Sequence, residues 1–215
     1  MCRDKLGVMA SEDYFRQIVE FERLPLETRI IEIKKGQDNT KYTYPIIHLL
    51  SLGDKENSLV ILVKNHLMSK GQRKIKDPEI IRFALELYKL AKPVHRRRIV
   101  QISGVLFGSG CTPILEEAIM DLETKVRLAA IYALEEVISD HWKDIIMSAL
   151  KDEDSMVRFS SINFISMKLR NNPNFRISVK LRRLIADLME DKDELVVLSA
   201  NNLLKELSVE KTIMY

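Results

Sequence analysis

The sequence predicts an all-α fold in which helical hairpins repeat along the chain. Three stretches align without a gap, and they begin at Leu115, Ile146 and Ile185. The second begins 31 residues after the first, and the third begins 39 residues after the second. A recurring period of this size is typical of stacked supersecondary units. The chain also holds only 7 Gly and 6 Pro in 215 residues, which favours helices.

Each stretch contains two apolar runs separated by a short charged segment. In the first stretch Val126, Ala130, Leu134 and Val137 recur at i, i+4, i+8 and i+11, which is one face of a helix. The earlier helix carries its own apolar residues: Leu115, Ala118, Ile119 and Leu122. A single hairpin cannot bury both apolar faces, so the sequence predicts that the hairpins stack into a solenoid.

The charged segment between the two helices repeats an aspartate, at Asp121, Asp152 and Asp191. An Asp just before an apolar helical run accepts the free amide hydrogens of the first turn. One aligned site of the second helix is always small: Ala130, Ser161 and Ala200. We expect the small side chain to let two helices approach closely.

The same template extends towards the N-terminus, so a single domain over residues 1–215 is predicted. It holds about five helical hairpins and an N-terminal helix pair that caps the stack. The helix pair is predicted at 11–36, and the hairpins at 44–70, 78–109, 112–140, 142–171 and 177–208. The hairpin at 78–109 fits the template more loosely, because its turn is basic rather than acidic.

The repeat resembles the HEAT repeat family over roughly the last hundred residues. The family pattern is an Asp in the turn followed by Val-Arg at the start of the second helix, which Val126-Arg127 and Val157-Arg158 match. Val196-Val197 departs from it. The resemblance implies a right-handed alpha-alpha superhelix. It also implies a structural ladder in which each Arg bonds the turn Asp of an adjacent repeat, and the residues placed in it are Asp121, Arg127, Asp152 and Arg158.

In this family the second helices usually line the concave face, and that face is the predicted binding site. The aligned residues that point away from the core positions are Leu128, Tyr132, Phe159, Asn163, Leu198 and Asn202. An apolar row beside a polar row is typical of a groove for a protein or peptide partner. The alternative is that Leu128, Phe159 and Leu198 pack between neighbouring helices.

A basic patch is the second candidate site. The chain carries a formal charge of +3, but residues 64–98 hold 11 basic and 3 acidic residues. The residues assigned to the patch are Lys70, Arg73, Lys74, Lys76, Arg96, Arg97 and Arg98. Such a patch could bind phosphate or an acidic protein surface, and the alternative is an ordinary solvated edge. No aromatic residue interleaves with it, so any nucleic acid would be held by its backbone.

No catalytic or cofactor motif is visible. None of the 4 His is followed by Glu. This excludes the His-Glu pairs with which deoxyhypusine hydroxylase, a HEAT-repeat enzyme, binds iron. The chain also lacks phosphate-binding and nucleophile-elbow motifs. The two cysteines, Cys2 and Cys111, form no zinc motif. We therefore expect no catalytic residue, metal or cofactor, and a reactive Cys111 at a helix start is the less favoured alternative.

The N-terminus is charged and has no apolar signal region, and the longest apolar run, Leu59–Val63, is far too short to span a membrane. A cytoplasmic protein is therefore predicted. Its predicted function is a non-enzymatic scaffold that binds a protein or peptide. The alternatives are a nucleic-acid-binding module that uses residues 64–98, and an enzyme with an unrecognised site in the groove.

Overall fold

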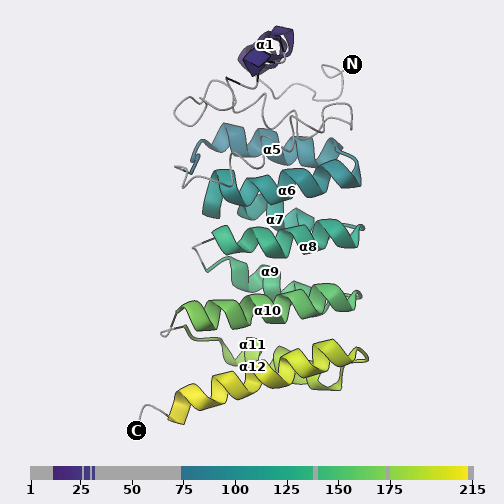
Figure 1. Cartoon of the computed structure of the whole chain (residues 1–215), viewed down its shortest axis with the longest axis vertical. Helices are drawn as coiled ribbons and strands as arrows, with labels where there is room; N and C mark the ends of the chain where they lie inside the picture. Colours follow the sequence, from purple (N-terminus) through teal and green to yellow (C-terminus); the bar gives the residue numbers. More distant parts are fainter. Residues whose placement is uncertain are drawn as a thin grey trace.

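The structure is a computed structural model that describes residues 12–25, 27–29, 31, 74–137, 140–172 and 175–212. All secondary structure in these ranges is helical, and they contain no strand. The all-α prediction is therefore confirmed for the described chain (Figure 1). The predicted hairpin at 44–70 and two residues of the basic patch, Lys70 and Arg73, lie outside the described residues.

After helix α1 (Glu12–Arg23) and the helical residues 27–29 and 31, the described helices come in consecutive pairs. The pairs are α5 (Pro78–Leu90) with α6 (Pro93–Phe107), α7 (Thr112–Ala118) with α8 (Thr124–Ala133), α9 (Trp142–Ala149) with α10 (Ser155–Asn171), and α11 (Val179–Asp187) with α12 (Glu194–Thr212). Short 3-10 turns follow α6, α8 and α11. Each of the last four predicted hairpin ranges thus holds two helices.

The second helices of the pairs lie one beside the next along the long axis of the molecule (Figure 1). α6 packs against α8, α8 against α10, and α10 against α12. The first helices α7 and α9 contact each other and the second helices of their own pairs, and α11 packs against α12. The described part of the chain is therefore a stack of helical hairpins.

The buried positions of α8 and of the 3-10 turn after it follow the predicted helical period. Val126, Ala130 and Leu134 are each 0% exposed. Ser161 takes the place of Ala130 in α10, and its hydroxyl donates to the Val157 carbonyl at 2.8 Å, so its burial leaves no unpaired polar atom. The prediction was wrong for Leu122, which lies in the turn after α7 and is 97% exposed.

Four of the described helices begin with a side-chain cap, and at α12 the cap is Asp193, which accepts from the Leu195 amide at 3.0 Å. Asp77 accepts a hydrogen bond from the Glu79 amide at 2.9 Å, Asp154 accepts one from the Met156 amide at 2.8 Å, and Ser178 accepts one from the Leu181 amide at 3.1 Å. Each cap satisfies an amide hydrogen that the first turn of a helix leaves free. The residue just before α10 is thus Asp154, not the aligned Asp152.

Gly104 lies at a very close contact between α6 and α8. A Cβ atom at this position would lie 2.8 Å from the Ala133 carbonyl oxygen and 3.2 Å from the Ala133 Cβ atom. These distances are shorter than packed atoms tolerate, so the contact depends on the missing side chain. A glycine that looks unfavourable for a helix is therefore required by its neighbour.

Among the residues that the structure describes, one helical stretch, Pro93–Ala118, is long and apolar enough to cross a membrane by length and composition alone. Within its most apolar window 67% is buried inside the protein, as in a core helix. The stretch is therefore weak evidence for a membrane span.

Candidate functional site

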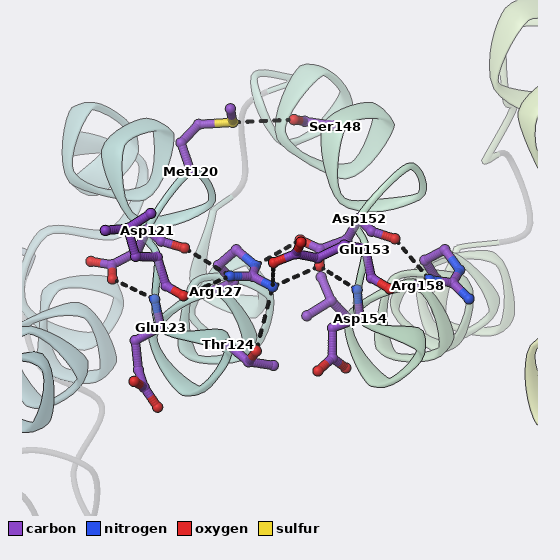
Figure 2. Close-up of polar contacts among 12 residues, drawn as sticks. Met120, Asp121, Glu123, Thr124, Arg127, Ser148, Asp152, Glu153, Asp154 and Arg158 are labelled. Carbon is purple, nitrogen blue, oxygen red and sulfur yellow. Dashed lines mark hydrogen bonds and ion pairs between the residues drawn. The ribbon is translucent and has the colours of Figure 1, made fainter.

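Arginine and aspartate side chains connect successive hairpins on the side of the turns (Figure 2). Arg127 in α8 donates from Nε to Oδ2 of Asp152 at 2.8 Å and from Nη2 to Oδ1 at 2.9 Å. The side chains are only 6% and 8% exposed. This fork-to-fork geometry is the strongest form of an Arg–carboxylate pair, and burial shields it from water.

The same contact recurs one hairpin further along. Arg158 in α10 donates to the two carboxylate oxygens of Asp191 at 2.7 and 2.6 Å. On the other side, Arg96 in α6 donates to both oxygens of Asp121 at 2.6 and 2.8 Å, and the Tyr88 hydroxyl adds a bond of 2.6 Å. We call these three pairs the ladder: Arg96–Asp121, Arg127–Asp152 and Arg158–Asp191.

Each aspartate of the ladder also shapes its own turn. Oδ1 of Asp121, Asp152 and Asp191 accepts the amide two residues later, at 2.9 Å in all three turns. Arg127 and Arg158 also bond to the turns of their own hairpins, since Nη1 of each donates to the carbonyl six residues earlier at 2.8 Å. Such Asx turns replace backbone bonds that the chain reversal removes. In each of the pairs Arg127–Asp152 and Arg158–Asp191, the arginine therefore orders the turn of its own hairpin, the aspartate orders the turn of the next hairpin, and the bond between them joins the two hairpins.

Hydrogen bonds of the ladder lower the pKa of Asp121 and of Asp191. Burial raises the pKa of Asp121, but hydrogen bonds from Arg96, Tyr88 and the Glu123 amide outweigh it and hold that pKa below its usual value. The hydrogen bonds from Arg158 lower the pKa of Asp191 against a smaller effect of burial. The bonds therefore stabilise the ionised carboxylates.

The ladder is a structural feature and ends where the repeat pattern ends. Val197 stands where an arginine would extend it beyond Asp191. The described residues contain no group of three or more His, Cys, Asp or Glu that could hold a metal ion. Burial raises the pKa of Cys111 to about 12, so its thiol stays protonated at neutral pH.

The structure gives two residues of the predicted basic patch another role. Arg96 belongs to the ladder. This role was not predicted from the sequence, because the turn of its own hairpin is basic rather than acidic. Lys74 donates to Glu136 Oε2 at 2.6 Å and to the Val105 carbonyl at 2.9 Å. Both cations thus neutralise or cap groups within the stack. Of the described patch residues, Lys76 is exposed, and Arg97 and Arg98 are partly buried.

The six residues of the predicted binding row all reach the surface of α8, α10 and α12. Tyr132 is 56% and Leu198 is 57% exposed, and Asn163 and Asn202 are also exposed. Leu128 and Phe159 are partly buried and pack against the core. Neither is fully buried between repeats, so the row is accessible, with two members that also support the packing. We call this surface the row face.

A second surface feature lies away from the row face and was missed from the sequence. A hollow of about 630 Å³ opens beside the turns that follow α7 and α9 and reaches the side of α11. Its rim carries Met120, 72% exposed, and Leu122, 97% exposed. The aligned residues of the next hairpin are Lys151 and Glu153. Two apolar residues at turn positions that are charged in the next repeat are the signal that could have revealed it.

Comparison with known proteins supports the fold alone. No family model matches the sequence, and no curated protein matches it. The X-ray structure of YibA from Escherichia coli is similar to this chain, with a TM-score of 0.52 and 17% sequence identity. The match covers 94% of this chain and 80% of YibA. At this identity the likeness concerns how the helices are arranged and carries no function.

Proposed function

We propose that the protein is a HEAT-like solenoid that works as a non-enzymatic scaffold and binds a protein or peptide through the row face. The observation that carries the proposal is the exposure of aligned side chains on α8, α10 and α12, of which α10 packs against both of the others. Rigidly stacked helices hold such side chains in a fixed line before any partner arrives. This reduces the entropic cost of binding.

The composition of the row face suits a macromolecular partner better than a small molecule. Exposed Tyr132 and Leu198 and partly exposed Phe159 are residue types that contribute strongly to protein interfaces. Met156 is 48% and Leu195 is 56% exposed at aligned positions beside the row. A line of exposed apolar groups on neighbouring helices fits an elongated partner surface.

The ladder supports the solenoid part of the proposal. A bidentate Arg–Asp pair recurs in the same relation at three successive junctions of the described chain. Repetition of one contact fixes a similar geometry between neighbouring hairpins, as nearest-neighbour packing in a solenoid requires.

Site-specific photo-crosslinking in the native cell tests the function. We expect a benzoylphenylalanine in place of Asn163 to form a covalent adduct with a protein partner, and the same group in place of exposed Arg183 on α11 to form none. Phe159→Ala should abolish the adduct by removing an apolar contact. Equal adducts at both positions, or none at position 163, would contradict binding through the row face.

A further inference from the structure

The row face extends onto α6 with a change of chemistry. Arg96 and Arg127 occupy the same place in the ladder and are 31 residues apart, so Arg97 aligns with Leu128. At the aligned position on α6, the residues of the apolar line, Leu128, Phe159 and Leu198, are thus replaced by the cation Arg97. Nε of Arg97 is buried without a hydrogen-bond partner, and Arg97 makes no ion pair with a residue that the structure describes. The α6 end of the row face is therefore positively charged.

Hydrogen-bonding side chains form a second line beside the first. Tyr132, Asn163 and Asn202 lie four residues after Leu128, Phe159 and Leu198, which places each pair on one side of its helix. None of the three bonds to another described residue. Each offers a hydroxyl or amide donor to an incoming group. We call Tyr132, Asn163 and Asn202 the donor line.

Charged groups of both signs lie beside the donor line. Arg170 donates to Glu206 at 2.8 Å, and the Ser166 hydroxyl donates to the same carboxylate at 2.8 Å. Burial lowers the pKa of Lys168, and the nearby carboxylates of Glu135 and Glu136 oppose that shift. The donor line therefore complements an uncharged segment, whereas Arg97 complements an acidic group.

The helix spacing selects the backbone conformation of that segment. Axes of packed helices lie about 8–10 Å apart, so the donor line offers one donor group in each interval of that size. A polyproline II chain rises about 3.1 Å per residue with three residues per turn, and so repeats its face about every 9.3 Å. A β-strand repeats its face after about 6.7 Å, which does not match.

Hydrogen bonding excludes a helical segment in turn. An α-helix uses its backbone carbonyls within itself. A polyproline II chain has no internal hydrogen bonds, so its carbonyls are free to accept from the donor line. Its rings or apolar side chains would meet Leu128, Phe159 and Leu198 on the neighbouring line.

We propose that the row face binds a proline-containing polyproline II segment of a partner protein, uncharged over α8, α10 and α12 and followed by an acidic residue over Arg97. This deepens, and rests on, the proposed function of the same face. One turn of the segment meets each helix. The donor line bonds its carbonyls, and the apolar line packs against its side chains.

Selection from a phage-displayed library of random peptides, each about twelve residues long, tests the proposal. That length covers about three turns and an acidic end. We expect the recovered peptides to carry prolines three residues apart and an acidic residue at one end. A variant combining Tyr132→Phe, Asn163→Ala and Asn202→Ala should bind them at least ~10-fold more weakly, since three hydrogen bonds are lost.

Arg97→Glu should invert the charge preference at the peptide end, whereas Arg183→Glu, on α11, should leave it unchanged. Circular dichroism should show the same helix content for every variant. Recovered peptides that need the row face but form helices or strands overturn the polyproline II assignment and leave the proposed function standing. If no recovered peptide depends on row-face residues, both proposals fail.

Discussion

At the residue scale, the arginines of the ladder decide how firmly neighbouring hairpins hold together. Arg127→Ala would leave the carboxylate of Asp152, 8% exposed, without its partner. Breaking a buried pair in this way costs about 3–5 kcal/mol, because the remaining charge stays desolvated. We expect a loss of about 3 kcal/mol in the free energy of unfolding, measured by urea denaturation.

The matched control is Arg170→Ala. Arg170 also pairs with a carboxylate, Glu206, but its side chain is 69% exposed. Exposed pairs contribute about 0–1 kcal/mol. Similar losses for the two substitutions would mean that the ladder contributes no more than surface ion pairs do.

The thiol of Cys111 is a second feature at this scale. Because burial raises its pKa to about 12, very little thiolate exists at pH 8. In a Cys2→Ser background, we expect iodoacetamide to label native Cys111 far more slowly than the urea-unfolded chain. Equal labelling rates would show that the site opens readily or that the thiol is ionised.

At the scale of the elements, close contact between α6 and α8 reverses what helix propensity predicts for Gly104. In an isolated helix Gly→Ala stabilises by about 1 kcal/mol. Here the new Cβ would lie 2.8 Å from the Ala133 carbonyl oxygen, a backbone atom that cannot rotate away. Overpacking of this kind costs about 1–3 kcal/mol.

We therefore expect Gly104→Ala to lower the melting temperature. Gly110→Ala is the control, because its Cβ would approach the end of the flexible Ile81 side chain at 2.9 Å. This substitution should cost less. A stabilised Gly104→Ala protein would show that α6 and α8 can separate without loss.

At the scale of the whole molecule, the ladder makes stability depend on pH in a defined direction. The folded pKa values of Asp121 and Asp191 lie below the unfolded value, which is about 3.9. Their contribution is therefore complete above that unfolded value and disappears as the pH falls through the lowered folded values. We expect the free energy of unfolding to decrease below about pH 4.

The variant Asp191→Asn separates this effect from general acid denaturation. It should be less stable than the wild type at pH 7, and the difference should shrink as the pH falls, because Asp191 then loses its charge as well. Asp187→Asn, at an exposed site on α11, is the control and should follow the wild type. A constant difference between wild type and Asp191→Asn at all pH values would argue against the lowered pKa.

Much of the architecture follows from local chemistry and was predictable. The aligned positions Val126, Ala130 and Leu134 are buried as their helical spacing requires. Side-chain spacing along one helix depends only on backbone geometry, which the residue pattern reveals. The exposed Leu122 shows the limit of this reasoning, since the helix before the turn ends at Ala118.

The sequence by itself determined the helical hairpins, their register and the side of each helix that faces the core. Only the tertiary structure decided which side chains meet across them. Arg96 bonds to Asp121, which is 25 residues further along the chain, and Lys74 bonds to Glu136, which is 62 residues further along. Both side chains are therefore used inside the stack and not in the basic patch that their charges had predicted. Charge and spacing along a chain do not encode such distant partners, because packing between elements selects them.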